Sequence, residues 1–167
     1  MHRFLKHIYS GYRRDVEYHN DLHGADVMQF SYLVLTEFGL IDLAKLSSLD
    51  ILSTIIASVC HDYGHDGYMN LYHINTVSDR AIRFSDKSVQ ENWHAAESFK
   101  IINQTETNFL SQLEKEDFRN FRKRFTGMIL ATDMSIHSGD LQMFEGLLSS
   151  HDVKEDGTNA KRMIDDS

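Results

Sequence analysis

The sequence predicts an all-helical protein, and three of its features support that prediction. The 167 residues contain no proline, whereas an average content of about 5% would give roughly eight. Proline is poorly tolerated inside helices, so its absence favours long ones. Apolar residues recur at intervals of three and four positions, which is the helical period. No segment shows a convincing strand pattern, so we expect a multi-helix bundle around one core.

Two helices are expected in the first forty residues. Phe4, Ile8 and Tyr12 recur at every fourth position and predict the first helix. The second is indicated by an apolar stripe that ends before Gly39, a typical C-terminal stop. The members of that stripe are Val27, Phe30, Leu33, Val34 and Phe38.

A third helix is expected from about Leu49 to Cys60. The residues Ser47-Ser48-Leu49-Asp50 supply side chains that cap helix N-termini. The segment is apolar nearly all round, which is typical of a central, buried helix. Such a helix would carry His61 and Asp62 at its C-terminal end.

The second half of the chain should contribute further helices. Asp66-Gly67 interrupts the pattern, and residues 67–87 are expected to be irregular with short helical pieces. Ser88 should begin a helix that runs through Ile102, and Gly139 to Leu148 should form a short one. A long helix is expected from Glu116 to Met134. Its inward side would carry Phe118, Phe121, Phe125, Met128, Ile129, Ala131 and Thr132.

Length and composition limit the class of protein. At 167 residues, one folded unit over residues 1–150 is expected, with residues 151–167 as a polar, acidic tail or loop. The net charge of −8 argues against a nucleic-acid partner. No apolar run reaches the ~20 residues of a membrane span, and no signal peptide is evident. The single cysteine fits a reducing compartment. We therefore expect an intracellular, cytoplasmic protein.

Two motifs about forty residues apart gather histidines and carboxylates. The first carries His19 and His23, and the second carries His61, Asp62 and His65. Each pair of histidines is four residues apart, so on a helix each pair would share one face. Imidazoles and carboxylates that converge from separate helices are typical ligands of divalent metals.

Metal-assisted hydrolysis is the chemistry that such a cluster suggests. Water between two divalent ions loses a proton near neutral pH, and a histidine that is not a ligand can protonate a leaving oxygen. Burying imidazoles and a carboxylate without partners is costly, and a metal removes that cost. The isolated histidines are expected to be surface or hydrogen-bonded core residues; they are His2, His7, His73, His137 and His151.

Four segments resemble the signatures of class I cyclic-nucleotide phosphodiesterases. They are Tyr18 to Gln29, His61 to Asn70, Ser88 to His94 and Leu130 to His137. They stand in the family's order within residues 4–148. The resemblance implies the all-helical, HD-type catalytic fold. It also implies a signalling hydrolase that converts 3',5'-cyclic nucleotides, cAMP or cGMP, into 5'-monophosphates by in-line attack of a metal-activated hydroxide.

The resemblance also implies roles for individual residues. His19 would be the general acid that protonates the 3'-oxygen. His23, His61 and Asp62 would bind a first metal such as Zn2+, and Asp62 would bridge to a second, Mg2+ or Mn2+. The remaining roles are supporting ones: waters around the second metal held by His65, Glu91 and Thr132, the loop supported by Asn70, and the pocket lined by Tyr18 and Met134. Asp133 is expected to be structural.

The chain departs from the family at two positions and in length. Asp66 stands where the family usually has proline or threonine, and Trp93 replaces a histidine and is expected to pack in the core. The family's domain is longer, and its C-terminal half supplies a fourth metal ligand, the purine-binding glutamine and a stacking aromatic. No residue here matches these three. We therefore expect the N-terminal part of a catalytic domain, with apolar faces left exposed and with activity that depends on the missing half.

Two alternatives remain open beside the enzyme. The chain would serve as a non-catalytic structural or regulatory subunit in a homo-oligomer or larger assembly, or as an HD-type phosphohydrolase of other nucleotides. A purely structural descendant has no physical need for the histidine–aspartate set, which favours the enzyme. The sequence does not separate cAMP from cGMP, because no purine-binding residues are recognised.

Overall fold

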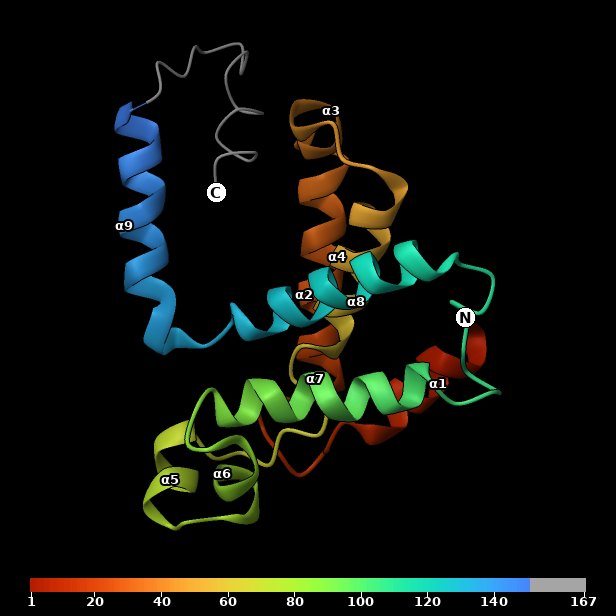
Figure 1. Ribbon diagram of the computed structural model, residues 1–167. Helices are drawn as coiled ribbons and strands as arrows, with labels where there is room; N and C mark the ends of the chain where they lie inside the picture. The colour runs from red at the N-terminus through yellow and green to blue at the C-terminus, as the bar shows by residue number, and fades with distance from the viewer. Residues whose placement is uncertain (151–167) are drawn as a thin grey trace.

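The computed structural model describes residues 1–150, and every regular element in that range is a helix (Figure 1). This confirms the all-helical prediction. The described helices are α1 (His2–Gly11), α2 (Asp21–Leu35), α3 (Leu40–Ala44), α4 (Ser48–Cys60), α5 (Asn70–Asn75), α6 (Asp79–Phe84), α7 (Val89–Ile102), α8 (Lys115–Leu130) and α9 (Met134–Ser150). The predicted tail, residues 151–167, lies outside the described residues.

The core forms where α4 meets its neighbours. α4 packs against α2 on one side and α8 on the other, and α7 packs against α8 and α1 (Figure 1). The largest fully buried side chains come from α1, α7 and α8, and they include Phe4, Ile8, Ile102, Phe121, Phe125 and Ile129. Phe121 and Phe125 stack with ring centroids 5.9 Å apart. The helices that carry the sequence motifs are thus held by one continuous apolar core.

The first and third predicted helices are confirmed. Phe4, Ile8 and Tyr12 are all buried, as their spacing predicts. α4 begins with a capping box in which the Ser47 hydroxyl accepts from the Asp50 amide and the Asp50 carboxylate accepts from the Ser47 amide. Such a box satisfies two backbone donors that a helix start leaves unpaired. α4 is therefore fixed at the end opposite His61.

The second predicted helix ends earlier than its apolar stripe suggests. α2 stops at Leu35, and Gly39 instead precedes α3 in a left-handed conformation. Phe30 and Phe38 are exposed, whereas Leu35, which the stripe omits, is buried. The stripe follows the helical period, but the face of α2 that meets α4 is set by the packing of both helices. The short helices predicted within residues 67–87 are confirmed as α5 and α6.

The predicted long helix from Glu116 to Met134 is wrong at its C-terminal end. α8 stops at Leu130, and a new helix, α9, starts at Met134. Asp133 accepts from the backbone amide of Ser135 at 2.9 Å and from the Ser88 hydroxyl at 2.7 Å. A carboxylate so placed caps a helix start, and the cap turns the chain. Ala131 and Thr132 are consequently exposed rather than inward, while Phe121, Phe125 and Ile129 are buried as predicted.

α9 leads away from the rest of the molecule (Figure 1). It begins five residues before the predicted start at Gly139 and runs past Leu148. Its apolar side chains are largely exposed, among them Leu141, Met143, Phe144 and Leu148. Exposed apolar side chains gathered on one helix are typical of an interaction surface. Among the described residues, no helix combines the length and apolarity needed to cross a membrane.

A close approach of α1 to the segment after α4 requires glycine at position 11. A Cβ on Gly11 would lie 2.0 Å from the hydroxyl oxygen of Tyr63. Tyr63 belongs to the segment that carries His61 and Asp62, and its ring packs edge-on against Tyr12 with centroids 6.0 Å apart. Gly11 therefore lets α1 support the segment that bears the second motif.

We predict that Gly11→Ala destabilises the fold by about 1–3 kcal/mol, because the Tyr63 ring must leave its place against Tyr12. Gly127→Ala is the matched control, since a Cβ there meets nothing within 4 Å. Alanine at this position in the last turn of α8 should stabilise by up to about 0.5–1 kcal/mol. Urea unfolding of both variants measures these changes. Equal stability of the Gly11→Ala variant and the wild type would contradict the packing described.

Asp133→Ala should loosen the first turn of α9, because it removes the side chain that caps it. Amide hydrogen exchange at Ser135 should be about fivefold to tenfold faster than in the wild type, as expected for a lost cap. Asp140→Ala changes an exposed acid within the same helix and serves as the control. Unchanged exchange at Ser135 would show that the cap does not hold the turn.

Candidate metal centre and active site

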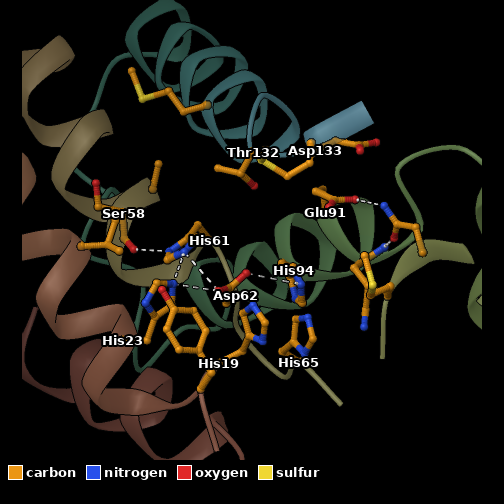
Figure 2. Close-up of a pocket in the computed structure, with 18 of the residues that line it drawn as sticks. His19, His23, Ser58, His61, Asp62, His65, Glu91, His94, Thr132 and Asp133 are labelled. Atoms are coloured by element: carbon orange, nitrogen blue, oxygen red, sulfur yellow. Dashed lines mark hydrogen bonds and ion pairs between the residues drawn. The ribbon is translucent and has the colours of Figure 1, made fainter. Parts of the chain in front are cut away.

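One cavity of about 860 Å³ collects residues from all four sequence motifs (Figure 2). It opens between α2, the loop after α4, the start of α7 and the junction of α8 with α9. All the residues predicted to belong to the site line it: Tyr18, His19, His23, His61, Asp62, His65, Glu91, Thr132 and Met134. Tyr18 and Met134 lie at its rim, where both are largely exposed.

The histidine pairs converge for a different reason from the one predicted. Asn20 caps α2, so His19 precedes the helix and His23 sits in its first turn. His61 is the C-terminal cap of α4, and His65 follows a turn at Gly64, whose φ is +70°. Neither pair shares a helix face, and the expectation from the i, i+4 spacing is wrong for both. The turns bring the rings together instead: His19 and His65 stack with centroids 4.0 Å apart.

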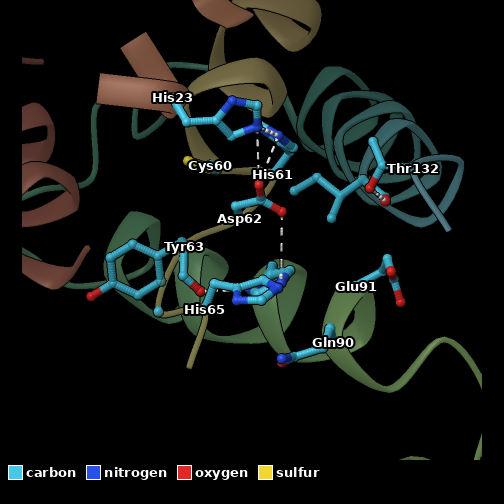
Figure 3. A network of polar contacts seen from close by, with 12 residues as sticks. His23, Cys60, His61, Asp62, Tyr63, His65, Gln90, Glu91 and Thr132 are labelled. Carbon is cyan, nitrogen blue, oxygen red and sulfur yellow. Dashed lines mark hydrogen bonds and ion pairs between the residues drawn. The ribbon is translucent and has the colours of Figure 1, made fainter. Parts of the chain in front are cut away.

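Three donor atoms meet at one point between α2 and α4 (Figure 3). The Nε2 atoms of His23 and His61 are 3.1 Å apart. One carboxylate oxygen of Asp62 lies 3.2 Å from the first and 3.1 Å from the second. Among the described residues, these three form the cluster whose ligand atoms could hold one metal ion. The Ser31 and Ser58 hydroxyls, 2.8 Å apart, fasten α2 to α4 beside it.

The tautomer of His61 directs a lone pair to that point. Its Nδ1 lies 2.8 Å from the Ser58 carbonyl oxygen, which can only accept, so Nδ1 carries the proton. In the neutral ring, Nε2 then faces His23 and Asp62 with its lone pair. A histidine that binds a metal typically donates its other N–H to a backbone carbonyl in this way.

The electrostatics of the cluster favour a positive charge at its centre. Burial raises the pKa of Asp62, but His61 and His94 outweigh burial and hold it well below its usual range. Burial and the neighbouring His61 lower the pKa of His23. Burial lowers the pKa of His61 too, but the hydrogen bond and charge of Asp62 raise it overall. An ionised carboxylate beside two imidazoles therefore favours the binding of a cation between them.

The spacing of the donors fits a divalent metal. A tetrahedral zinc site with Zn–N bonds of 2.0–2.1 Å has ligand–ligand edges of about 3.3–3.4 Å. The three separations of 3.1–3.2 Å come within a few tenths of an ångström of these edges. Two imidazoles and one carboxylate also form a ligand set that leaves a position open, as in catalytic zinc sites.

His94 faces the other oxygen of Asp62, and the sequence-based site omits it. Its Nε2 is 3.9 Å from that oxygen, and its Nδ1 donates to the Tyr63 carbonyl at 2.7 Å. Burial lowers its pKa to about 4. His94 follows Glu91 by three residues on α7, a spacing that places both on one face. That spacing was the sequence feature that could have identified it.

His65 has a defined tautomer as well. Its Nδ1 accepts a hydrogen bond from the Gly67 amide at 2.9 Å, so the proton is on Nε2. Burial and the nearby His19 lower its pKa to about 4, which keeps the ring neutral. A neutral ring with the proton on Nε2 can donate to a water or a substrate oxygen. His65 therefore stands outside the donor cluster as a hydrogen-bond donor.

Glu91 and Thr132 lie across the cavity from His23 (Figure 2). Glu91 accepts from the Asn70 side chain at 2.8 Å, and burial raises its pKa. The Thr132 hydroxyl donates to the Ile129 carbonyl at 2.7 Å. Neither joins the three-atom donor cluster. Asp133 has the capping contacts described above, as expected for a structural residue.

The sequence matches one protein family over most of its length. Residues 18–165 match the family of 3'5'-cyclic nucleotide phosphodiesterases. A dual-specificity calcium/calmodulin-dependent 3',5'-cyclic nucleotide phosphodiesterase from Drosophila melanogaster is 36% identical over 157 residues, or 93% of this chain. The 3',5'-cyclic-nucleotide phosphodiesterase regA from Dictyostelium discoideum is 32% identical over 98% of this chain.

Solved structures agree with the sequence comparison. The phosphodiesterase domain of a rhodopsin–phosphodiesterase fusion from the choanoflagellate Salpingoeca rosetta superposes with a TM-score of 0.81 at 27% identity. The match covers 96% of this chain and 50% of that one. This chain spans 19% and 20% of the lengths of the Drosophila and Dictyostelium relatives. The resemblance inferred from the four motifs is confirmed: the chain belongs to the 3',5'-cyclic nucleotide phosphodiesterase family.

Proposed function

We propose that this chain is part of an enzyme that hydrolyses 3',5'-cyclic nucleotides, cAMP or cGMP, to nucleoside 5'-monophosphates with the help of divalent metals. The observation that supports this most directly is the meeting of the His23, His61 and Asp62 donor atoms inside the cavity. Family membership supplies the substrate class. A cytoplasmic location is the setting we propose, because the single cysteine, Cys60, is buried and unpaired.

His23, His61 and Asp62 would hold the first metal, for which Zn2+ suits the imidazoles. The second oxygen of Asp62 would be left for a harder ion, Mg2+ or Mn2+. When bound, such ions polarise phosphoryl oxygens and lower the pKa of water to near neutrality. His65 and Glu91 would orient water on the far side of Asp62, His65 through its Nε2 proton and Glu91 through its carboxylate. Thr132 would complete that side of the cavity.

His19 would protonate the 3'-oxygen as it leaves. Its ring stacks on His65 and is T-shaped to His23, with centroids 5.9 Å apart, so it lies beside the donor cluster without joining it. Among the described residues, no hydrogen bond ties up either ring nitrogen of His19. A histidine with a free N–H next to the scissile bond is suited to general acid catalysis. Tyr18 packs against His23, with centroids 4.6 Å apart, and shields the site's edge together with Met134.

A second candidate function is that of a structural or regulatory subunit. The exposed apolar side chains of α9 favour it, because such a surface suits a homo-oligomer or a larger assembly. Both candidates use the same fold, and they differ in whether the cavity turns over substrate.

Metal binding should depend on the three clustered residues. After removal of metal with a chelator, titration with Co2+ should show a site with the visible absorption of a low-coordinate ion. His61→Ala or Asp62→Ala should weaken binding by about a hundredfold or more, since each removes a direct ligand. His19→Ala should bind normally and serves as the control. Wild-type metal affinity in either ligand variant would contradict the assignment of that residue as a metal ligand.

Hydrolysis of cAMP and cGMP should depend on His19. With Zn2+ and Mg2+ or Mn2+ present, His19→Ala should lower turnover by about 10²–10⁴-fold with unchanged metal content, as expected for a lost general acid. His7→Ala, a change to an exposed histidine of α1, is the control. Retained turnover in His19→Ala would refute its role. Absence of turnover of either nucleotide by the wild-type protein would mean that the chain is either a subunit of this kind or a catalytic domain that needs the family's C-terminal half for activity.

A further inference from the structure

The two positions at which the chain departs from its family are joined in space by a third residue, Arg80 of α6. One guanidinium nitrogen of Arg80 lies 3.2 Å from the Asp66 carboxylate. The guanidinium carbon lies 4.1 Å from the centroid of the Trp93 ring, over its face. Asp66 and Trp93 are therefore parts of one arrangement rather than separate substitutions. Trp93 is half-buried and does not belong to the apolar core in which it was expected to pack; the Arg80 guanidinium covers its ring instead.

Gln90 completes this arrangement and is almost fully buried (Figure 3). Its side-chain nitrogen donates to the Asp66 carboxylate and to the Tyr68 carbonyl, each at 2.7 Å. Its side-chain oxygen accepts from Arg80. Arg80 also donates to the Gly64 carbonyl at 3.2 Å. The loop is thus held at residues 64, 66 and 68, on both sides of His65.

The loop needs such contacts because its own backbone is permissive. Gly64 and Gly67 flank His65, with φ angles of +70° and +91°. Glycine at these angles adopts many alternatives in the absence of external contacts. The tautomer of His65 depends on the amide of Gly67 staying within hydrogen-bond distance of Nδ1. Whatever fixes residues 64–68 therefore also fixes which nitrogen of His65 carries the proton.

We propose that Asp66, Arg80 and Gln90 form a loop clamp, a set of positioning residues that holds His65 with its Nε2 proton directed into the cavity. The clamp requires arginine at position 80, because only a planar fork bonds Gly64, Asp66 and Gln90 at once while lying on Trp93. His73 adds to it, with Nε2 3.3 Å from Asp66. Among the described residues, no buried side-chain nitrogen or oxygen lacks a partner, so the network is satisfied.

The catalytic meaning of the clamp rests on the proposed function, in which His65 orients water. The stacking of His65 on His19 extends its reach, because a displaced His65 leaves His19 without its neighbour. Two residues of that site would then depend on Asp66, Arg80 and Gln90, none of which belongs to the proposed metal-binding or acid–base residues. The tautomer of His65, by contrast, is set by contacts within the chain and is measurable without metal.

The test is nuclear magnetic resonance of the metal-free chain with ¹⁵N-labelled histidine. Two-bond ¹H–¹⁵N correlations report the tautomer of His65, and amide exchange reports the bond from Gly67. The wild type should show the Nε2–H tautomer and a protected Gly67 amide. Gln90→Leu, which keeps the side chain's size, should give mixed tautomers and exchange at Gly67 about tenfold faster or more.

The control is Arg124→Gln, which breaks the Arg124–Asp50 ion pair between α8 and α4. It should leave both readouts at their wild-type values. If Gln90→Leu does not fold, Arg80→Lys is the test variant, because it keeps the positive charge and loses the planar guanidinium. Exchange at the Gly67 amide should then be about fivefold faster than in the wild type.

Three results would overturn the clamp. The first is an unchanged His65 tautomer and Gly67 exchange in a folded clamp variant, and the second is an equal change of both in Arg124→Gln. The third is an Nδ1–H tautomer of His65 in the wild type. Absence of metal binding would refute the proposed function and leave this result standing.

Discussion

The rest of the site is arranged around three ligand atoms that meet at one point, the Nε2 atoms of His23 and His61 and one oxygen of Asp62. They are held 3.1–3.2 Å apart, and burying two imidazoles and a carboxylate together carries a cost that a shared proton or metal ion reduces. The fold keeps them there through ordinary helix chemistry. Asn20 caps the helix that carries His23, and the Ser58 carbonyl sets the tautomer of His61. Apolar packing of α2 and α8 on α4 provides the stability that offsets this local cost.

The loop after α4 is the part of the molecule where structure and chemistry are most closely linked. Within a few residues it supplies Asp62 to the donor cluster and His65 to the cavity, while two glycines in left-handed conformations allow its turns. Such a loop does not define a site by itself. Polar side chains from α6 and α7 hold it from outside, with Gln90 and His94 bonded to its carbonyls at Tyr68 and Tyr63. α7 thus presents Glu91 and His94 to the site and anchors the loop opposite them.

Sequence reasoning predicted the helices whose ends and faces are encoded locally. α1 follows from the spacing of Phe4, Ile8 and Tyr12, and α4 from the capping box at Ser47. The break between α8 and α9 was missed, because Asp133 reads as a helix residue until Ser88, forty-five positions away, is known to bond it. The site residues were predicted from motifs and do line one cavity. The explanation by shared helix faces failed because turns place the histidines, and Arg80 was missed because only long-range contacts bring it to the loop. His94 was missed although its spacing from Glu91 on α7 was a local signal.

The central claim is that two imidazoles and one carboxylate bind a divalent metal together. X-ray absorption at the zinc edge of the zinc-loaded chain tests it most directly, because it identifies the ligand atoms without relying on activity. The account predicts scattering from two imidazole rings and from oxygen, with metal–ligand distances of about 2.0–2.2 Å. A first shell containing sulfur, or one with fewer than two imidazoles, would contradict it.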